Sequence, residues 1–251
     1  MRSRGGNQAS ALQQVTVTLR RPGVKLSIII PVYNERATIR QAIARVRAVN
    51  LAGVEKEIIV VDDGSTDGTG DILRDYAGQG VIVHTFASNL GKGTAVRKGI
   101  ETATGDIVLV QDADLEYDPQ DYPALLEPIR QGQAEVVYGS RFLGQIEDMR
   151  LSNRMANRAF ALLTNLLCGT EITDEATGYK VFRAEVIKGL HIRARRFEFC
   201  PEVTAKLAKR GYKIHEVPIR YKGRSRKEGK KIGWRDGLMA LWTLFKYRFV
   251  D

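Results

Sequence analysis

Hydrophobic runs alternate with amphipathic segments along most of the chain. Mostly apolar runs that end in polar residues predict strands buried on both faces of a sheet, at residues 25–33, 55–65, 80–86, 105–114 and 134–142. Helices are expected between them, because apolar residues such as Ile39, Ile43 and Val46 recur at helical spacing. Strands that alternate with helices predict an α/β fold with an open, mostly parallel sheet flanked by helices.

The pattern changes after about residue 145. Helices are expected at 151–168 and near 199–210, followed by a strand at 212–221 and a C-terminal amphipathic helix at 232–250. The apolar side of the last helix consists of Trp234, Leu238, Leu241, Trp242 and Phe245. Basic residues flank this side, so two interpretations stand equally: packing in the core, or contact with an anionic membrane.

The composition narrows the classes of partner. The 251 residues carry a net charge of +10, which favours anionic partners such as nucleotides, phosphorylated metabolites or an acidic membrane surface. Neither a zinc-finger spacing nor an aromatic RNA-binding strand is present, so we expect no nucleic acid partner. Cys168 and Cys200 are isolated thiols that fit a reducing cytoplasm. We also expect no secretory signal and no membrane span, because no apolar run approaches about 20 residues.

Acids occupy every second position in "VQDADLEYDP": Asp112, Asp114, Glu116 and Asp118. In an extended chain such residues share one face, and a divalent cation would offset their repulsion. Asp118 is the exception, because Pro119 follows it and the pair is typical of a helix N-cap with proline at the first helical position.

Polar groups also follow other predicted strands. In "VVDDGSTDGTG", Asp63 either belongs to a capped turn or accepts a hydrogen bond from a base N–H. In "NLGKGTAVRKG", the glycines, Lys92 and a helix N-terminus suit a phosphate group, although a plain helix start has the same residues. Because ligands of open α/β sheets bind beyond the carboxyl ends of the strands, these positions predict a nucleotide diphosphate site.

The segment "YKGRSRKEGKK" is rich in Lys and Arg. Charge runs of this kind are usually solvated loops. The alternative is a lid over phosphates, with Gly223 and Gly229 permitting its movement.

Together these segments resemble the family 2 glycosyltransferases of GT-A fold, in particular the polyprenyl-phosphate sugar synthases that make dolichyl-phosphate mannose and dolichyl-phosphate glucose. The motifs that carry the resemblance are "IPVYNE", "VVDDGSTDGT", "GKGTAVRKG", "DADLE", "YGSRF", "TGYKVFR", "EVPI" and "GRSRKEGKK". The resemblance implies a single GT-A domain at 25–251, with a nucleotide-binding half at about 25–145 and an acceptor and lid half at about 146–251. The polar residues 1–24 before it are expected to form a disordered basic tail.

The resemblance also implies roles for individual residues. It places around the base and ribose Pro31, Tyr33, Glu35, Val61 and Asp63. Asp112 and Ala113 would line the nucleotide, and Asp114 with Glu116 would hold Mg²⁺ or Mn²⁺. Arg141 would face the phosphates, and Arg224 and Lys230 would clamp donor and acceptor phosphates.

These implications lead to a hypothesis of inverting transfer of a hexose from a GDP-mannose or UDP-glucose type of donor to a dolichyl or undecaprenyl phosphate. The chain would act as a peripheral protein on the cytoplasmic membrane face, alone or with a membrane partner protein. Asp174 is a candidate for orienting the acceptor, or simply a turn residue. The alternatives are transfer to a sugar or protein hydroxyl, with Asp174 or Glu175 as base, and a non-catalytic protein that binds nucleotide sugars.

Overall fold

The structure, a computed structural model, describes residues 23–224 and 234–250. The expected basic tail therefore lies almost wholly outside the described residues. The same holds for Lys230 and for most of the basic segment that follows Lys222.

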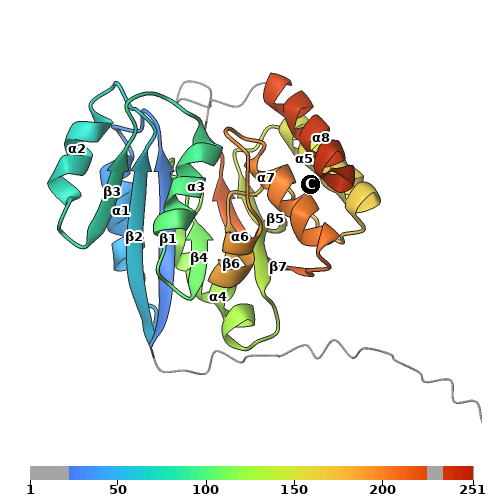
Figure 1. The fold of residues 1–251 in the computed structure, drawn as a ribbon, viewed down its shortest axis with the longest axis horizontal. Helices are drawn as coiled ribbons and strands as arrows, with labels where there is room; N and C mark the ends of the chain where they lie inside the picture. Colours follow the sequence, from blue (N-terminus) through green and yellow to red (C-terminus); the bar gives the residue numbers. More distant parts are fainter. Residues whose placement is uncertain (1–22, 225–233, 251) are drawn as a thin grey trace, which may run out of the picture.

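Strands and helices alternate through the first half of the chain as the hydrophobic pattern predicts (Figure 1). The strands are β1 (Val24–Val32), β2 (Val54–Asp62), β3 (Val81–Thr85), β4 (Ile107–Val110), β5 (Val136–Glu147), β6 (Lys180–Arg183) and β7 (Ile214–Lys222). The helices are α1 (Ile39–Ala48), α2 (Thr69–Tyr76), α3 (Lys92–Thr102), α4 (Tyr122–Arg130), α5 (Leu151–Cys168), α6 (Ala184–Gly189), α7 (Phe199–Lys209) and α8 (Trp234–Phe249), with a short 3₁₀ helix, η1, at Pro119–Asp121.

The described strands form one seven-stranded sheet in the order β3-β2-β1-β4-β6-β5-β7. All pairings are parallel except those of β6, which runs antiparallel to both β4 and β5. The open, mostly parallel sheet predicted from the sequence is thus confirmed. The strand order reverses between β1 and β4, and the carboxyl ends of these two strands are where such folds bind ligands.

Each face of the sheet packs against its own set of helices. Ile28 and Ile30 of β1 point to the side covered by α1, α2 and α4, whereas Ile29 points to the side covered by α3, α6 and α7. This follows from the two-residue period of a strand, which sends successive side chains to opposite faces. Burial on both faces explains why β1 is apolar without alternation.

Helices α5, α7 and α8 form a smaller layer beside the sheet (Figure 1). Leu244 and Tyr247 of α8 pack with Ala205 of α7. The apolar side predicted for the last helix does not face this layer, because the side chains of Leu238, Leu241, Trp242 and Phe245 are exposed. Of the two interpretations of these four residues, packing in the core is therefore wrong.

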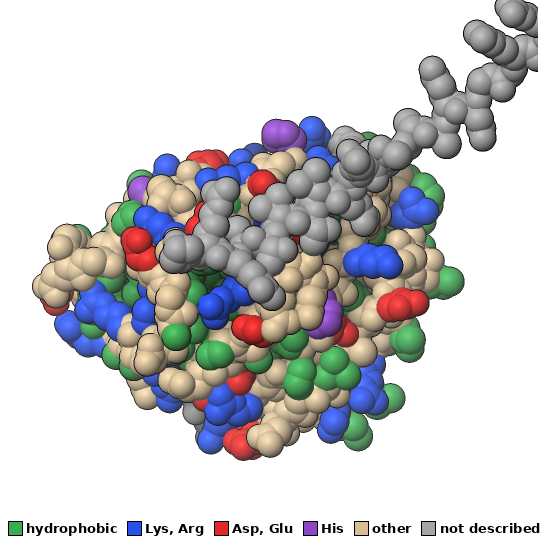
Figure 2. All heavy atoms as spheres, turned by 90° about the horizontal axis from the view of Figure 1, so that it is seen from below, with side chains coloured by type: hydrophobic (Ala, Val, Ile, Leu, Met, Phe, Trp, Pro, Cys, Tyr) green, Lys and Arg blue, Asp and Glu red, His purple; other side chains and the backbone are tan. Residues whose placement is uncertain are grey.

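Charge is spread over the surface. On the face seen from below, the Lys and Arg side chains of the described residues are interspersed with acidic and hydrophobic ones and form no single continuous patch (Figure 2). Within residues 23–224 and 234–250, every helix is too short or too polar to cross a membrane.

Candidate active site

Asp112, Asp114 and Glu116 lie on a turn that follows β4. Leu115 has a φ of 64°, a left-handed conformation that folds the chain back, and the amide of Glu116 donates a hydrogen bond to Asp114 Oδ1 at 3.1 Å. The acids therefore converge through a turn, which corrects the expectation that they share one face of an extended chain. Asp118 departs from this group, as predicted.

Asp118 caps the 3₁₀ helix η1. Its Oδ1 accepts a hydrogen bond of 3.0 Å from the amide of Gln120, and Pro119 occupies the first helical position. The carboxylate also pairs with Arg220 at 3.3 Å. The prediction of an N-cap is confirmed, and it separates this acid from the three that precede it.

Lys92 and Asp112 form an ion pair beyond the carboxyl end of β4. Lys92 begins α3, and its ammonium group contacts Asp112 Oδ1. On the other side of this carboxylate lies Gly178, where an added Cβ would stand 2.5 Å from Asp112 Oδ2. The loop that precedes β6 therefore packs directly against the acid, and Lys92 offsets its charge.

Arg224 connects the acids that follow β4 to the end of β1. Its Nη2 lies 3.1 Å from Asp114 Oδ2, and its Nη1 lies 3.1 Å from Glu35 Oε2. The backbone amide of Arg224 also donates to Glu116 Oε1 at 2.7 Å. The structure thus brings four of the residues named from the sequence together, while Lys230, which was paired with Arg224 in the hypothesis, lies outside the described residues.

Tyr221 fixes Glu116 from the end of β7. The phenol donates a hydrogen bond of 2.9 Å to Glu116 Oε2. Burial raises the pKa of Tyr221, and the negative charge of Glu116 raises it further, so the phenol stays protonated and remains a donor. The guanidinium of Arg141 lies over the same ring, 5.1 Å from its centroid.

Arg141 and Asp174 form a buried two-pronged ion pair. Nε and Nη2 of Arg141 each donate to the carboxylate at 2.7 Å, and the amide of Arg141 adds a third hydrogen bond at 3.0 Å. Glu216 of β7 in turn accepts the amides of Thr173 and Asp174 at 2.7 and 3.0 Å. These hydrogen bonds hold the loop before β6 to Arg141 of β5 and to Glu216 of β7, and Asp174 is fully buried.

Asp63 joins the loop after β2 to the start of α3. Its two oxygens accept the amides of Leu90 and Gly91 at 2.7 and 2.8 Å. Burial raises the pKa of Asp63, and these hydrogen bonds oppose the rise. Gly64, with a φ of 71°, allows the two loops to meet, since an added Cβ would lie 2.5 Å from the carbonyl carbon of Ser88. This contact between two loops is neither a turn capped within the segment 60–70 nor a contact with a base, so the assignment of Asp63 to the base stays a prediction.

The other residues assigned to the nucleotide lie at the same edge of the sheet. Pro31 and Val61 are register partners on β1 and β2, and Tyr33 follows β1 directly. Ala113 is buried beside the acids. No contact tests their assignment to a base or ribose, which stays a prediction.

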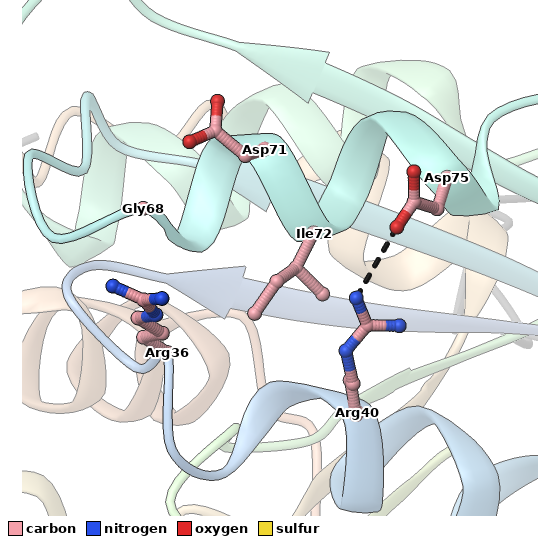
Figure 3. A pocket seen from close by; sticks show the side chains of 6 residues that line it. All are labelled: Arg36, Arg40, Gly68, Asp71, Ile72 and Asp75. Carbon is pink, nitrogen blue, oxygen red and sulfur yellow. Dashed lines mark hydrogen bonds and ion pairs between the residues drawn. The ribbon is translucent and has the colours of Figure 1, made fainter.

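Two hollows flank the start of α1. One, of about 480 Å³, adjoins the acids and is lined by Asn34, Glu35, Arg36, Ala37, Thr38, Asp67 and Arg224. The other, of about 450 Å³, lies between α1 and α2 (Figure 3) and is lined by Arg36, Arg40, Gly68, Asp71, Ile72 and Asp75. Arg40 and Asp75 form an ion pair across the second hollow. Of the two hollows, the first is lined by Glu35 and Arg224 and therefore adjoins the candidate site.

Asp114 and Glu116 have the donor chemistry of a hard divalent cation. Burial, followed by the negative charges of Asp112 and Glu116, raises the pKa of Asp114 to about 7. Oxygen ligands of this kind suit Mg²⁺ and Mn²⁺. In the part of the chain that the structure describes, however, no three acidic, His or Cys side chains surround one point, and Arg224 contacts both acids.

Sequence reasoning missed two residues that hold the site, Glu216 and Tyr221. Glu216 stands between His215 and Val217 in β7, a strand that also carries Arg220 and Lys222, so an acid there gave no signal that set it apart from the other polar residues of the strand. Tyr221 gave no signal either, because a tyrosine at a strand end is ordinary.

Comparison with known proteins agrees with this geometry. A family model described as Glycosyl transferase family 2 matches residues 27–190. Dolichol-phosphate mannosyltransferase of Pyrococcus furiosus is 32% identical over 219 residues, which cover 83% of this chain and 61% of that protein. Undecaprenyl-phosphate mannosyltransferase of Micrococcus luteus is 32% identical over 246 residues, which cover 90% of this chain and 99% of that protein.

A solved structure with the same fold is glucosyl-3-phosphoglycerate synthase from Mycobacterium tuberculosis, determined with Mn²⁺, uridine diphosphate and glucosyl-3-phosphoglycerate. Its TM-score is 0.69 at 21% identity, over 91% of this chain and 81% of that one. The likeness is one of fold, and it confirms the expected GT-A class.

Proposed function

The chain belongs to glycosyl transferase family 2, and we propose that it moves a hexose from a nucleotide diphosphate sugar to a polyprenyl phosphate with inversion at the transferred carbon. Both relatives above have a polyprenyl phosphate in their names, dolichol phosphate in one and undecaprenyl phosphate in the other. The match with the second covers 90% of this chain and 99% of that protein. A donor of the GDP-mannose or UDP-glucose type would bind beyond the carboxyl ends of β1 and β4, where open α/β sheets bind their ligands.

The burial of Asp174 and Glu175 is the observation that favours a phosphate acceptor over a hydroxyl acceptor. Transfer to a hydroxyl needs a base within reach of the proton. Asp174 is fully buried with both oxygens on Arg141, and Glu175 is also fully buried. Neither carboxylate is presented to an incoming hydroxyl, which favours an acceptor that needs no base.

A phosphate acceptor meets this condition. A phosphate monoester with a second pKa near ~6 is anionic at neutral pH, so one of its oxygens can attack the donor sugar without losing a proton first. The bond from the anomeric carbon to the new phosphate oxygen forms as the bond to the nucleoside diphosphate breaks. The chain has to hold two phosphate-bearing substrates together and to stabilise the charge that the leaving group gains.

Several residues would divide this work. Arg141 is fixed by Asp174 through Nε and Nη2, which leaves Nη1 as the group that would meet a phosphate. Arg224 and Lys92 would add positive charge on the donor side. A Mg²⁺ or Mn²⁺ ion held by Asp114 and Glu116 would offset the charge of the leaving diphosphate.

A lipid acceptor requires the chain to reach a membrane surface, and α5 and α8 suit this contact. These helices pack side by side and expose Leu151, Met155, Leu162, Leu166, Leu238, Met239, Leu241, Trp242, Phe245 and Phe249. The two helices contain a single acid, Asp236 in the first turn of α8, whereas Arg154, Arg158, Lys246 and Arg248 are exposed. An apolar surface in which basic residues outnumber acids fits peripheral contact with anionic lipids.

A transfer assay tests the proposal. The chain with Mn²⁺ receives labelled GDP-mannose or UDP-glucose and either a short polyprenyl phosphate or the matching polyprenol. We expect label in the phosphate product alone, and none with Asp114→Asn, while the exposed Asp71→Asn control retains transfer. Absence of transfer to the phosphate with these donors, or equal transfer to the alcohol, would contradict it.

A further inference from the structure

The carboxylates of Asp114 and Glu116 are fully engaged by neighbouring groups. Asp114 Oδ1 accepts the amide of Glu116, and Asp114 Oδ2 accepts Nη2 of Arg224. Glu116 Oε1 accepts the amide of Arg224, and Glu116 Oε2 accepts the phenol of Tyr221. Each oxygen therefore already carries a hydrogen bond, and only one of the four bonds comes from a charged group.

That charged group is the guanidinium of Arg224. It lies 3.1 Å from Asp114 Oδ2 and 3.1 Å from Glu35 Oε2, so it bridges one acid from the loop after β1 and one from the turn after β4. The side chains of all three residues are mostly buried, with 16%, 18% and 10% of the surface of Arg224, Asp114 and Glu35 exposed. At such burial an unpaired carboxylate is costly, and a cation beside it stabilises its charged form.

In this position Arg224 leaves one of its own hydrogen-bond donors unpaired within the described residues. Its Nε is buried, and the described part of the chain offers it no acceptor. A side chain that leaves a buried donor unpaired can be displaced more easily than one with all donors satisfied. Its backbone bond to Glu116 does not depend on the position of the guanidinium.

We propose that Arg224 is the resident cation of this acid cluster, and that a divalent cation binds to Asp114 and Glu116 by replacing its guanidinium. The two cations cannot both occupy Asp114 Oδ2, because their like charges would meet within hydrogen-bond distance. Arg224 therefore sets the affinity of the site for metal. This inference rests on the proposed function only for its consequence, namely that a displaced guanidinium stands beside the bound metal and is free for a substrate phosphate.

The test measures Mn²⁺ binding to the full chain without donor or acceptor, by the loss of the free-ion signal in electron paramagnetic resonance. Arg224→Gln removes the competing charge, and we expect it to tighten Mn²⁺ binding roughly tenfold, the factor that corresponds to about 1.4 kcal/mol. Arg224→Lys keeps a positive charge and should bind as weakly as the unaltered chain. Arg220→Gln is the matched control, because Arg220 pairs with Asp118 and Asp121 and does not contact Asp114.

A second variant guards against misfolding of the first. Arg224→Met removes the guanidinium and replaces it with an uncharged side chain of different chemistry, so Mn²⁺ binding should tighten to the same degree as with Arg224→Gln. Unchanged or weaker binding in both variants would overturn the proposal, and so would a lack of Mn²⁺ binding by every form of the chain. Because no sugar donor is present, either result stands apart from the outcome of the transfer assay.

Discussion

Asp174 holds Arg141 through two parallel hydrogen bonds of 2.7 Å, with 0% of the carboxylate side chain and 6% of the guanidinium side chain exposed. This pair fixes the orientation of the guanidinium, including Nη1, the nitrogen that the proposed function assigns to a substrate phosphate. Its rigidity depends on Glu216, which holds the amide of Asp174 from β7.

Asp174→Asn should therefore destabilise the fold strongly. Removing one partner of a buried ion pair leaves the other charge uncompensated, which costs about 3–5 kcal/mol. We expect a lower midpoint of urea unfolding with an unchanged slope. Glu127→Gln is the control, since Glu127 and Arg130 form an exposed pair at 4.0 Å whose loss should cost less than about 1 kcal/mol. Similar midpoints for the two variants would refute the claim that the buried pair supports the fold.

Glu57 should make stability depend on pH in the acid range. Burial tends to raise its pKa, but hydrogen bonds from Ser27 and Thr104 and the contact with Lys25 outweigh burial and lower the pKa to about 2. A lowered pKa in the folded state gives stability that is complete above the unfolded pKa of about 4.3 and is lost as the pH falls towards 2. The contribution is at most about 3 kcal/mol, because one pKa unit corresponds to about 1.4 kcal/mol.

Urea unfolding of the unaltered chain and of Glu57→Gln at pH 7, 4 and 3 checks this. We expect the variant to be less stable at pH 7 and the difference between the two proteins to shrink as the pH falls. A difference that stays constant from pH 7 to pH 3 would show that the carboxylate charge does not contribute.

Asp114 and Asp118 offer a matched pair of acids from one segment. Asp114→Ala should abolish the rise in melting temperature that nucleotide sugar and Mn²⁺ together produce, because a bound ligand stabilises only if its site is intact. Asp118→Ala should lower the melting temperature without ligand, since loss of an N-cap costs about 1 kcal/mol, and should keep the ligand-dependent rise. If Asp114→Ala also kept that rise, the assignment of the metal to Asp114 would be wrong.

The sheet and its helices could be predicted from the sequence because their signals are local. Residues such as Ile28, Ile29 and Ile30 form a run that is buried on both faces, and a run of this kind is typical of a central parallel strand. The N-cap at Asp118 was equally local, since it depends only on the proline that follows. The crevice followed from the alignment of polar residues at the strand ends.

The contacts within the site could not be predicted in the same way. The turn at Leu115 depends on a left-handed residue that is not glycine, and the partners of Glu116 and Arg141 come from β7, far along the chain. Tertiary contacts of this kind leave no periodic signal. The exposed side of α8 shows the same limit, because periodicity identifies an apolar side of a helix but not what it faces.

The exposed surface of α5 and α8 should bind anionic membranes. We expect the chain to cosediment with vesicles that contain phosphatidylglycerol, less with pure phosphatidylcholine, and less again at high salt, because the basic residues act through screened charge. The double variant Leu166→Ser and Trp242→Ser removes two exposed apolar side chains, one from each helix, and should reduce vesicle binding at least about tenfold, since fully burying one such side chain contributes roughly 1.5–3 kcal/mol. Ile82→Ser is the control, because Ile82 is exposed on β3 at the far edge of the sheet. Equal loss of binding in the control, or no loss in the double variant, would mean that another surface meets the lipid.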